Sequence, residues 1–597
     1  MKHAPRNHVY RLVWNRARSA WVAVAEITRG RRKTSNGRLA AAFLSLSAAF
    51  AQAAPLGGQI AAGAGSISQS GATTTVQQAS PKLSINWQSF NVAPQETVNF
   101  VQPSAAAIAV NRIFDTNGSQ ILGHLNANGQ VYLINPNGIL FGRGAQVNVG
   151  GLVASTLDLD DASLNGNTRT FHGSGGSVVN LGTIHAANGG YVALLGNHVS
   201  NQGVISAQLG TIALAAGSAV TLTFRGNSLV QMRVEENVLN SLAESGGLIR
   251  ADGGTVLMTA GAKNALLASV VNNTGIIEAR TVENHNGTII LQGGMQAGQV
   301  NVGGTLDASA PNGGNGGFIE TSAAQVKVAN DARVTTAAPS GSYGSWLIDP
   351  QDFRVAASGG DISGAALTAN LGATTVTVQR GGGGSAGSGN INVDDAVSWS
   401  ANTTLTLTAS NHVNVNANVA ATGDTAGIAI NPNTANGGEA ASGTGTFNLK
   451  SGAAITLSGA NPSLAIAGTP YTVINSLGVP GDTSATTLQG MNGNLGGHYA
   501  LGSDIDATAT AGWNVGGGFT PVGSPGAAFT GAFDGLGHSV SNLAINQPGA
   551  DYVGMFGSVA VGVAIRNVGL IGRSVSGRSV VGALAGKRQY RRTIVGI

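Results

Sequence analysis

The sequence predicts an all-β chain folded as a right-handed parallel β-helix, a β-solenoid with short capping and extra-helical strands, behind a removable N-terminal segment. Three observations predict this fold. Glycine accounts for 90 of 597 residues, while charged residues make up only 10% and aromatic residues 5%. Apolar runs are short and are separated by glycine and asparagine turns. Similar segments also return at a nearly constant spacing, as expected of a stack of repeated coils.

The N-terminal segment has the three parts of a signal peptide in the expected order. Residues 1–38 contain ten Lys and Arg and a single acidic residue, Glu26. An apolar stretch follows at Leu39–Phe50, and its 12 residues are fewer than the roughly 20 that a membrane-spanning helix needs. Ala51–Ala53 then offers the small side chains that a signal peptidase requires. We therefore predict cleavage after Ala53, with Ala54 as the alternative, and a first segment of residues 1–53.

The main body is acidic although the whole chain carries a formal charge of +4. Setting aside the ten bases and one acid of residues 1–38, and four bases in residues 587–597, leaves 17 Lys and Arg against 26 Asp and Glu. This balance argues against nucleic acid as a partner. Since the chain has no cysteine, its fold uses neither disulfides nor thiolate metal sites.

The repeats are clearest after residue 180, where "NLGTIHAANGGYVALLG" begins at Asn180 and "NQGVISAQLGTIALAAG" begins 21 positions later at Asn201. Their shared pattern, N-x-G-x-I-x-A followed by a glycine turn and an apolar run, predicts one coil per repeat, with asparagines able to form ladders between coils. A β-sandwich or barrel of hairpins is the alternative fold. Alternation within the strands predicts inward side chains at Ile184, Val192, Leu194, Ile205, Ile212, Leu214, Val256, Ile276, Ile289 and Leu291.

The most distinctive part of the sequence lies between residues 83 and 164. Its central motif consists of Asn135, Pro136, Asn137, Gly138 and Ile139. Proline fixes φ and ends the preceding strand "QVYLI", and Asn-Gly tolerates positive φ, so the motif predicts a tight corner between two strands.

Together with "NWQSFNV" (Asn86–Val92) and "GLVAST" (Gly151–Thr156), this motif gives residues 55–300 a specific resemblance to a known family. The segment resembles the secretion domain, or haemagglutination activity domain, of filamentous-haemagglutinin-like exoproteins exported by two-partner secretion (TPS). Within this family it is most similar to the high-molecular-weight non-pilus adhesins. A second family motif, Asn-Pro-Asn-Leu, has no counterpart in the N-terminal region. Tyr10–Lys33 resembles the extended signal peptide of such large secreted proteins.

The resemblance implies a route of export and a set of partners. The Sec machinery and a signal peptidase would deliver the chain to the periplasm of a Gram-negative bacterium. An outer-membrane TpsB-type barrel transporter with POTRA domains would then carry it to the cell surface or the medium. Asn135 and Asn137 would serve either recognition by this transporter or nucleation of the β-helix, and both roles remain open. The receptor on a host cell or on another bacterium is unknown.

The distal half divides by composition. Beyond a secretion domain at residues 54–340, we expect a further β-repeat region at 341–510, starting near "GSYGSWLIDPQDFRV". Residues 511–586 resemble the GLUG repeats of bacterial surface proteins, on motifs such as "FDGLGHSVSNLAI" (Phe533–Ile545). The basic tail at 587–597 departs sharply in charge, which suggests a truncated or frame-shifted end.

No motif in the chain predicts catalysis, and we expect no enzyme, no catalytic residue, no cofactor and no metal site. The acidic pairs Asp160/Asp161 and Asp394/Asp395 are expected to be solvated turn residues. The favoured function is adhesion. The alternatives are the stem of a contact-dependent inhibition protein, a cytolysin or haem-scavenging exoprotein and, less favoured, a β-helical carbohydrate-active enzyme.

Overall fold

The computed structural model describes residues 10–15, 20–25, 54–173, 175–235, 241–261, 269–380, 387–435, 441–588 and 594–595. The chain separates into two units, residues 1–52 and 53–597. In the first unit, β1 (Tyr10–Asn15) and β2 (Ala20–Ala25) pair in antiparallel fashion. The predicted cleavage residue Ala53 lies outside the described residues, whereas Ala54 is buried.

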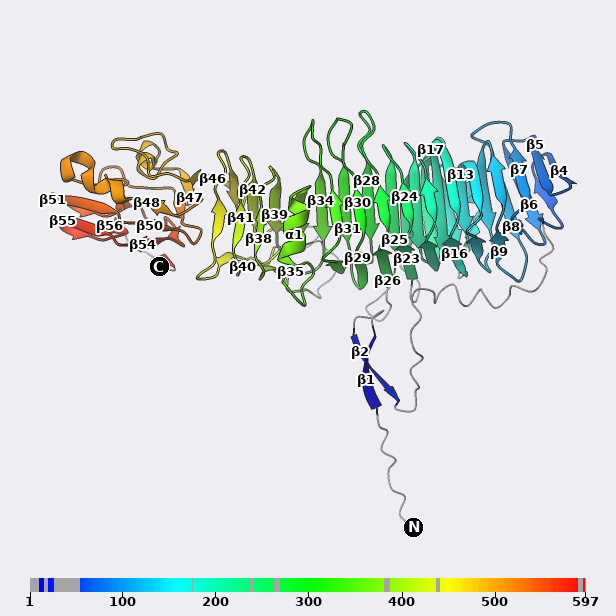
Figure 1. Cartoon of the computed structure of the whole chain (residues 1–597), viewed down its shortest axis with the longest axis horizontal. Helices are drawn as coiled ribbons and strands as arrows, with labels where there is room; N and C mark the ends of the chain where they lie inside the picture. Colours follow the sequence, from blue (N-terminus) through cyan, green and yellow to red (C-terminus); the bar gives the residue numbers. More distant parts are fainter. Residues whose placement is uncertain are drawn as a thin grey trace, which may run out of the picture. The chain divides into compact units, whose positions relative to one another are not determined.

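The second unit is a parallel β-helix, as predicted, and its longest ladder joins one strand from each successive coil (Figure 1). Each strand pairs in parallel with its counterparts in the coils before and after, so its backbone N–H and C=O groups find partners on both sides. In chain order the ladder contains β6 (Lys82–Trp87), β8 (Ile108–Ile113), β11 (Gln130–Ile134), the second half of β13 (Gln146–Ser155), the second half of β17 (Thr183–Gly196), β20 (Thr211–Ala216), β25 (Thr255–Ala260), β28 (Thr288–Gln292), β31 (Phe318–Ser322), β34 (Ser345–Asp349), β36 (Thr375–Gln379), β39 (Thr404–Thr408), β42 (Gly427–Asn431) and β45 (Ser463–Ile466).

Two further parallel ladders complete the coils of the N-terminal part. One contains β5 (Thr73–Gln78), β7 (Thr97–Val101), β10 (His124–Ala127), the first halves of β13 and β17, β19 (Val204–Ser206), β24 (Leu248–Arg250), β27 (Ile276–Glu278), β30 (Thr305–Asp307) and β33 (Arg333–Thr335). The other contains β9 (Ser119–Ile121), β12 (Ile139–Phe141), β16 (Ser177–Asn180), β18 (His198–Asn201), β23 (Ser241–Ser245), β26 (Ser269–Asn273), β29 (Gly298–Val302) and β32 (Gln325–Val328).

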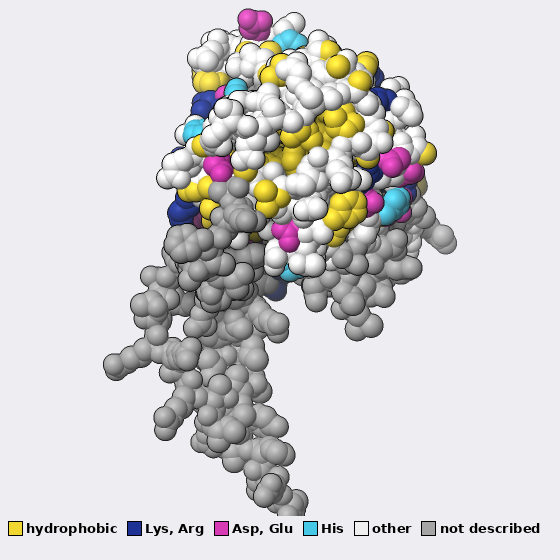
Figure 2. Space-filling view, turned by 90° about the vertical axis from the view of Figure 1, so that its right-hand side faces the viewer, with side chains coloured by type: hydrophobic (Ala, Val, Ile, Leu, Met, Phe, Trp, Pro, Cys, Tyr) yellow, Lys and Arg dark blue, Asp and Glu magenta, His cyan; other side chains and the backbone are white. Residues whose placement is uncertain are grey.

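Short antiparallel strands cap the first coil. β3 (Gln59–Ala62) pairs with β6, and β4 (Gly65–Ser70) pairs with β5. These strands cover the unpaired edge of the first coil, which would otherwise invite pairing with another chain. Figure 2 views the unit from this end, where hydrophobic side chains lie near the centre with polar side chains around them.

The predicted inward residues form one continuous core, with a single correction. Nine of the ten are fully buried, but the side chain of Ile276 is 45% exposed and its neighbour Ile277 is buried instead. The ladder explains this, because Ile277 pairs with the inward residues Ile249 and Leu306. Successive side chains of a strand point to opposite faces, so only one of two adjacent isoleucines can face the core.

Buried asparagines and glycines explain the repeated N-x-G pattern. Asn180, Asn201 and Asn273 are fully buried, and the Asn180 Nδ2 donates to Asn201 Oδ1 of the next coil at 2.8 Å. This confirms the predicted asparagine ladder for one step; in the next coil Ser245 takes the position and accepts from Asn201 Nδ2 at 3.4 Å. The glycine two positions later lets the backbones touch, since a Cβ added at Gly247 would lie 2.1 Å from the Gly203 carbonyl oxygen.

An extra-helical antiparallel sheet covers the outer face of the long ladder. It consists of β14 (Asp158–Leu159), β15 (Thr168–His172), β21 (Ala219–Arg225) and β22 (Ser228–Glu235). Beneath it lies a second apolar cluster that includes Tyr132, Ile134 and Tyr191. The apolar runs "QVYLI" and "TIALAA" are therefore buried on both faces, which accounts for their lack of alternation.

Arg169 of this sheet brings a charge into the cluster. Only 7% of the residue is exposed, and its guanidinium carbon lies 4.0 Å from the centroid of the Phe224 ring. The Tyr132 and Tyr191 hydroxyl groups lie 2.9 Å apart, and Tyr191 donates to Gln130 Oε1 at 2.7 Å. Burial raises the pKa of the Tyr191 hydroxyl well above its ordinary value. The face of the Phe224 ring stabilises the buried guanidinium cation of Arg169.

The coil stack continues beyond the expected boundary at residue 341. β31, β34 and β36 pair in one unbroken ladder, so the composition change near "GSYGSWLIDPQDFRV" does not interrupt the fold. α1 (Gly364–Leu371), capped by the Ser363 side chain, packs beside β38. The corresponding shorter ladders contain β35 (Phe353–Val355), β37 (Ile391–Val393), β40 (Val413–Val415) and β43 (Phe447–Leu449), and β38 (Val397–Trp399), β41 (Val419–Ala421) and β44 (Ile455–Leu457).

A second core begins near residue 474 rather than at the expected boundary of 511. Antiparallel pairing of β45 with β46 (Thr469–Ile474) marks the change, and a separate apolar cluster runs from Ile474 to Val568. Its parallel ladders contain β46, β47 (His498–Leu501), β49 (Ala532–Asp534), β53 (Ile565–Arg566) and β57 (Ile594–Val595); β48 (Ile505–Asp506), β50 (Ser539–Ser541) and β54 (Gly569–Ile571); β51 (Ala544–Val553) and β55 (Ser574–Val581); and β52 (Phe556–Val559) and β56 (Ala585–Arg588).

Asp349, at the end of β34, makes the stability of the stack depend on pH. Its Oδ1 is buried without a hydrogen-bond partner among the described residues. Burial, together with the negative charge of Glu320, raises the pKa of the Asp349 carboxyl to about 6. An unfolded aspartate has a pKa of about 3.9. The folded protein therefore gains stability from holding the Asp349 proton, and this gain is fully present below about pH 4. The gain is lost as the pH rises through 6, where the folded-state carboxyl ionises.

We expect Asp349→Asn to stabilise the protein at pH 7.5 and to leave its stability at pH 4 nearly unchanged. The pKa difference corresponds to at most about 3 kcal/mol, which partial solvent exposure reduces to about 1 kcal/mol. Guanidinium unfolding midpoints of the wild type and the variant, measured at both pH values, test this. Equal midpoints at pH 7.5 would show that the carboxylate is solvated.

Candidate secretion and nucleation site

The Asn135–Ile139 motif forms a corner between two ladders, as predicted. β11 ends at Ile134 and β12 begins at Ile139. The Gly138 N–H donates to the Asn135 carbonyl oxygen at 3.1 Å, which closes the turn. Gly138 has φ of 120°, a conformation that side chains other than glycine resist. The chain therefore leaves one face of the coil and enters the next within four residues.

The Asn135 side chain holds this corner to the coil before it. The residue is fully buried, and its Nδ2 donates to the Asn117 carbonyl oxygen at 3.1 Å and to Ser119 Oγ at 3.0 Å. Its Oδ1 accepts a hydrogen bond from the backbone N–H of Asn137 at 2.9 Å. One amide thus fixes the turn itself and its position on the preceding coil.

Backbone hydrogen bonds join the same corner to the coils on both sides. The Ser119 N–H donates to the Gly138 carbonyl oxygen at 2.9 Å, and the Gly176 N–H of the following coil donates to the Pro136 carbonyl oxygen at 2.8 Å. Ile139 of β12 is buried in the core. The motif is therefore a junction of three successive coils.

Pro136 and Asn137 are the exposed residues of the motif. The Asn137 Nδ2 donates to the Asp115 carbonyl oxygen at 2.7 Å, so the side chain lies along the surface toward the preceding corner. A partner protein could contact these two residues without disturbing the core. Asn135 is therefore buried within the coil stack, whereas Asn137 is accessible at the surface.

The sequence interpretation missed the partners of the corner in the preceding coil. Asp115, Asn117 and Ser119 all contact the motif. They lie in the segment "DTNGS", whose Asn117-Gly118 precedes Asn137-Gly138 by 20 positions. Aligning these two Asn-Gly pairs at the coil spacing would have placed one corner directly on the other.

The acidic pairs hold local structure in the loops where they were expected. Asp160 Oδ1 accepts a hydrogen bond from the Ala162 N–H at 3.0 Å, and Asp161 pairs with Arg112 at 2.6 Å. Asp394 pairs with Arg354, and Asp395 accepts a hydrogen bond from the Gly364 N–H at 2.8 Å. Within the described ranges, no group of three His, Asp or Glu residues could hold a metal ion. No helix in that same part of the chain is long and apolar enough to cross a membrane.

Two family models match the chain in this order. Residues 7–54 match the Extended Signal Peptide of Type V secretion system, and residues 51–308 match the TPS secretion domain. The chain carries a TPS secretion domain. The Asn135 corner lies inside this domain, whereas the expected GLUG repeats lie outside the matched residues. The extended signal peptide confirms that the N-terminal segment directs secretion by way of the periplasm.

Several known proteins are similar to part of this chain. A "Heme/hemopexin-binding protein" of Haemophilus influenzae is 36% identical over 254 residues, which cover 41% of this chain and 28% of that protein. "Halomucin" of Haloquadratum walsbyi is 46% identical over 93 residues, 15% of this chain and 1% of that protein. The crystal structure of the HMW1 secretion domain from Haemophilus influenzae is 22% identical, with a TM-score of 0.47, and covers 69% of this chain and all of that domain. The chain thus aligns with only 28% of the heme/hemopexin-binding protein and 1% of halomucin.

Proposed function

We propose that this chain is a two-partner-secreted adhesin, whose TPS domain is exported by an outer-membrane TpsB-type transporter and whose β-helix carries the binding surface. The match of residues 51–308 to the TPS secretion domain carries the proposal. The Sec machinery delivers the chain to the periplasm of a Gram-negative bacterium, and a signal peptidase removes residues 1–53. POTRA domains of the transporter then bind the TPS domain. The proposal includes GLUG repeats in the distal part and assigns no catalytic activity.

The β-helix supports a mechanism in which folding outside the membrane draws the chain through the transporter. The periplasm contains no ATP, so export needs another source of free energy. Each coil contacts mainly the coils before and after it, so coils can form one after another as the chain emerges. Burial of inward side chains such as Ile184 and Ile205 provides several kcal/mol per coil before chain entropy is subtracted. The three-coil junction at Asn135 is a suitable starting point.

Secretion of the full chain tests the proposal directly. The chain is expressed in a Gram-negative host with and without a TpsB-type barrel transporter from the same organism. We expect the processed protein in the medium only when the transporter is present. If a folded, protease-resistant form stays in the periplasm despite an active transporter, two-partner export is wrong.

Haem capture is a second candidate function, favoured by the relative described as a heme/hemopexin-binding protein. That relative aligns over only 28% of its length, so its binding activity does not pass to this chain without a test. Retention of the secreted chain on immobilised haem or hemopexin, compared with its binding to cultured cells, separates the two candidates. Adhesion predicts binding to cells that excess haem does not compete away.

A further inference from the structure

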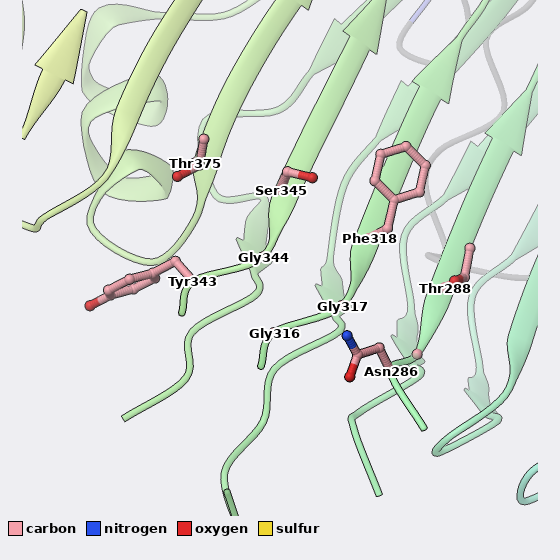
Figure 3. A pocket seen from close by; sticks show the side chains of 10 residues that line it. Asn286, Thr288, Gly316, Gly317, Phe318, Tyr343, Gly344, Ser345 and Thr375 are labelled. Carbon is pink, nitrogen blue, oxygen red and sulfur yellow. The ribbon is translucent and has the colours of Figure 1, made fainter. Parts of the chain in front are cut away.

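A groove of about 360 Å³ crosses successive coils where β28, β31, β34 and β36 begin (Figure 3). It lies on the outside of the long ladder, away from the Asn135 corner. Its walls include Asn286, Thr288, Phe318, Tyr343, Ser345 and Thr375, and glycines form its floor. The volume suits a small ligand or a segment of a longer one.

The glycine floor is a consequence of close coil stacking. A Cβ added at Gly317 would lie 2.1 Å from the Gly287 carbonyl oxygen, and one added at Gly344 would lie 2.0 Å from the Gly317 carbonyl oxygen. No side chain can therefore fill this line between adjacent coils. The neighbouring positions carry side chains, so the glycines lie in a recess. Figure 3 shows Tyr343 and Asn286 on either side of these glycines.

One wall of the groove is a row of aligned side chains from four consecutive coils. Thr288 pairs with Phe318, Phe318 with Ser345, and Ser345 with Thr375 in the parallel ladder. Parallel in-register strands place these side chains on the same face, about 4.8 Å apart from coil to coil. The row therefore presents an aromatic ring flanked by hydroxyl groups, at a spacing close to the width of one sugar ring.

Four polar side chains of the groove are free to bind a ligand. Within the part of the chain that the structure describes, no hydrogen bond uses the side chains of Asn286, Thr288, Tyr343 or Ser345. These groups offer both donors and acceptors. No Lys, Arg, Asp or Glu lines the groove, so it has no charge to attract a phosphate, a sulfate or an acidic sugar. The Tyr343 side chain, on the opposite side from Asn286, adds a second aromatic ring that is 37% exposed.

We propose that this groove binds a neutral oligosaccharide that lies along the coil stack. Sugar rings combine an apolar face, which packs on aromatic rings such as those of Phe318 and Tyr343, with hydroxyl groups that exchange hydrogen bonds with Asn286, Thr288 and Ser345. A chain of such rings matches a binding surface that repeats once per coil. The inference deepens the adhesin part of the proposed function and rests on it, because it names the class of receptor.

The test uses the full secreted chain on an array of immobilised neutral, sialylated and sulfated oligosaccharides of host and bacterial types. We expect the protein to bind neutral oligosaccharides. Binding to those of host type or of bacterial type identifies the source of the receptor. Phe318→Ala and Tyr343→Ala should each weaken binding at least tenfold. Phe318→Leu, which keeps most of the volume and removes the ring, should behave like Phe318→Ala if the fold is intact. Phe114→Ala, at a 67% exposed aromatic residue outside the groove, is the matched control and should bind normally.

Three results would overturn the groove assignment: no binding by the wild type, binding restricted to charged oligosaccharides, or unchanged binding in both Tyr343→Ala and Phe318→Leu. A cell-adhesion assay on the same proteins separates this outcome from failure of the proposed function. If the wild type and the variants adhere to cells equally well, the groove assignment is wrong and the adhesin proposal stands. If the secreted wild type adheres to no cell but binds the array through the groove, the adhesin proposal fails instead.

Discussion

Asn135→Ala is expected to abolish release of the chain into the medium in a host that contains the partner transporter. The substitution removes an amide that makes three hydrogen bonds in a fully buried position. It leaves Ser119 Oγ and the Asn117 carbonyl oxygen without this donor, and the Asn137 N–H without its acceptor. Such a loss costs about 3 kcal/mol. Because the corner joins three coils, this destabilisation is expected to affect all three of them.

Asn137→Ala is the matched variant, since it changes the same residue type two positions later. Asn137 is exposed and loses a single side-chain hydrogen bond, to the Asp115 carbonyl oxygen. We expect a cost of about 1 kcal/mol or less. Immunoblots of medium and periplasm, with thermal unfolding of each purified variant, separate the two roles of the motif.

The pair of variants distinguishes folding from recognition. If folding at the corner controls export, Asn135→Ala is retained and Asn137→Ala is largely secreted. If the transporter reads the exposed side chain, Asn137→Ala is retained although its stability is nearly normal. Release of Asn135→Ala at the wild-type level would contradict both roles of that residue.

The sequence was sufficient to predict the parallel β-helix because its repeats fix the direction of each strand and the alternation within it. The error at Ile276 came from the run "GIIEA", in which either isoleucine could face inward. Applied strictly, the pattern N-x-G-x-I-x-A starting at Asn273 selects Ile277, as the structure does. The register of the neighbouring coils therefore contains more information than the hydrophobicity of the strand alone.

The position of the extra-helical sheet could not be predicted in the same way. β15 pairs with β21 across about 50 residues, and neither strand belongs to the repeat. Antiparallel pairing at such a separation leaves no periodic signal in a single sequence. The one indication was the apolar character of both faces of "QVYLI" and "TIALAA", because a strand buried on both faces needs a second layer.

The site was predicted only in part for a related reason. The corner at Asn135–Ile139 follows from proline and glycine chemistry within one segment. Its partners Asn117 and Ser119 come from the preceding coil, and the Gly176 N–H comes from the following one. The groove beside Phe318 likewise depends on four coils, and its residues are unremarkable within any single repeat. Sites on a solenoid arise from the stacking of coils, so they become visible only when the coils are aligned.

Close stacking of the coils also gives the largest expected loss of stability, from Gly247→Ala. A Cβ at this position would lie 2.1 Å from the Gly203 carbonyl oxygen, well inside van der Waals contact. The contact atom belongs to the backbone and cannot rotate away, so the two coils must separate. The strands β19 and β24 would lose their pairing at this corner, at a cost of about 4 kcal/mol or more.

The break should be local, because each coil of a solenoid depends on its neighbours. We expect limited proteolysis of Gly247→Ala to cut near residues 241–250 and to leave the preceding coils protected. Gly512→Ala is the control, since an added Cβ there would meet no atom within 4 Å, and it should give the wild-type pattern. An unchanged pattern and an unchanged unfolding midpoint for Gly247→Ala would show that the coils can separate at little cost. In that case the burial of successive coils could not hold the chain outside the membrane during export, and the folding-driven mechanism would be wrong as well.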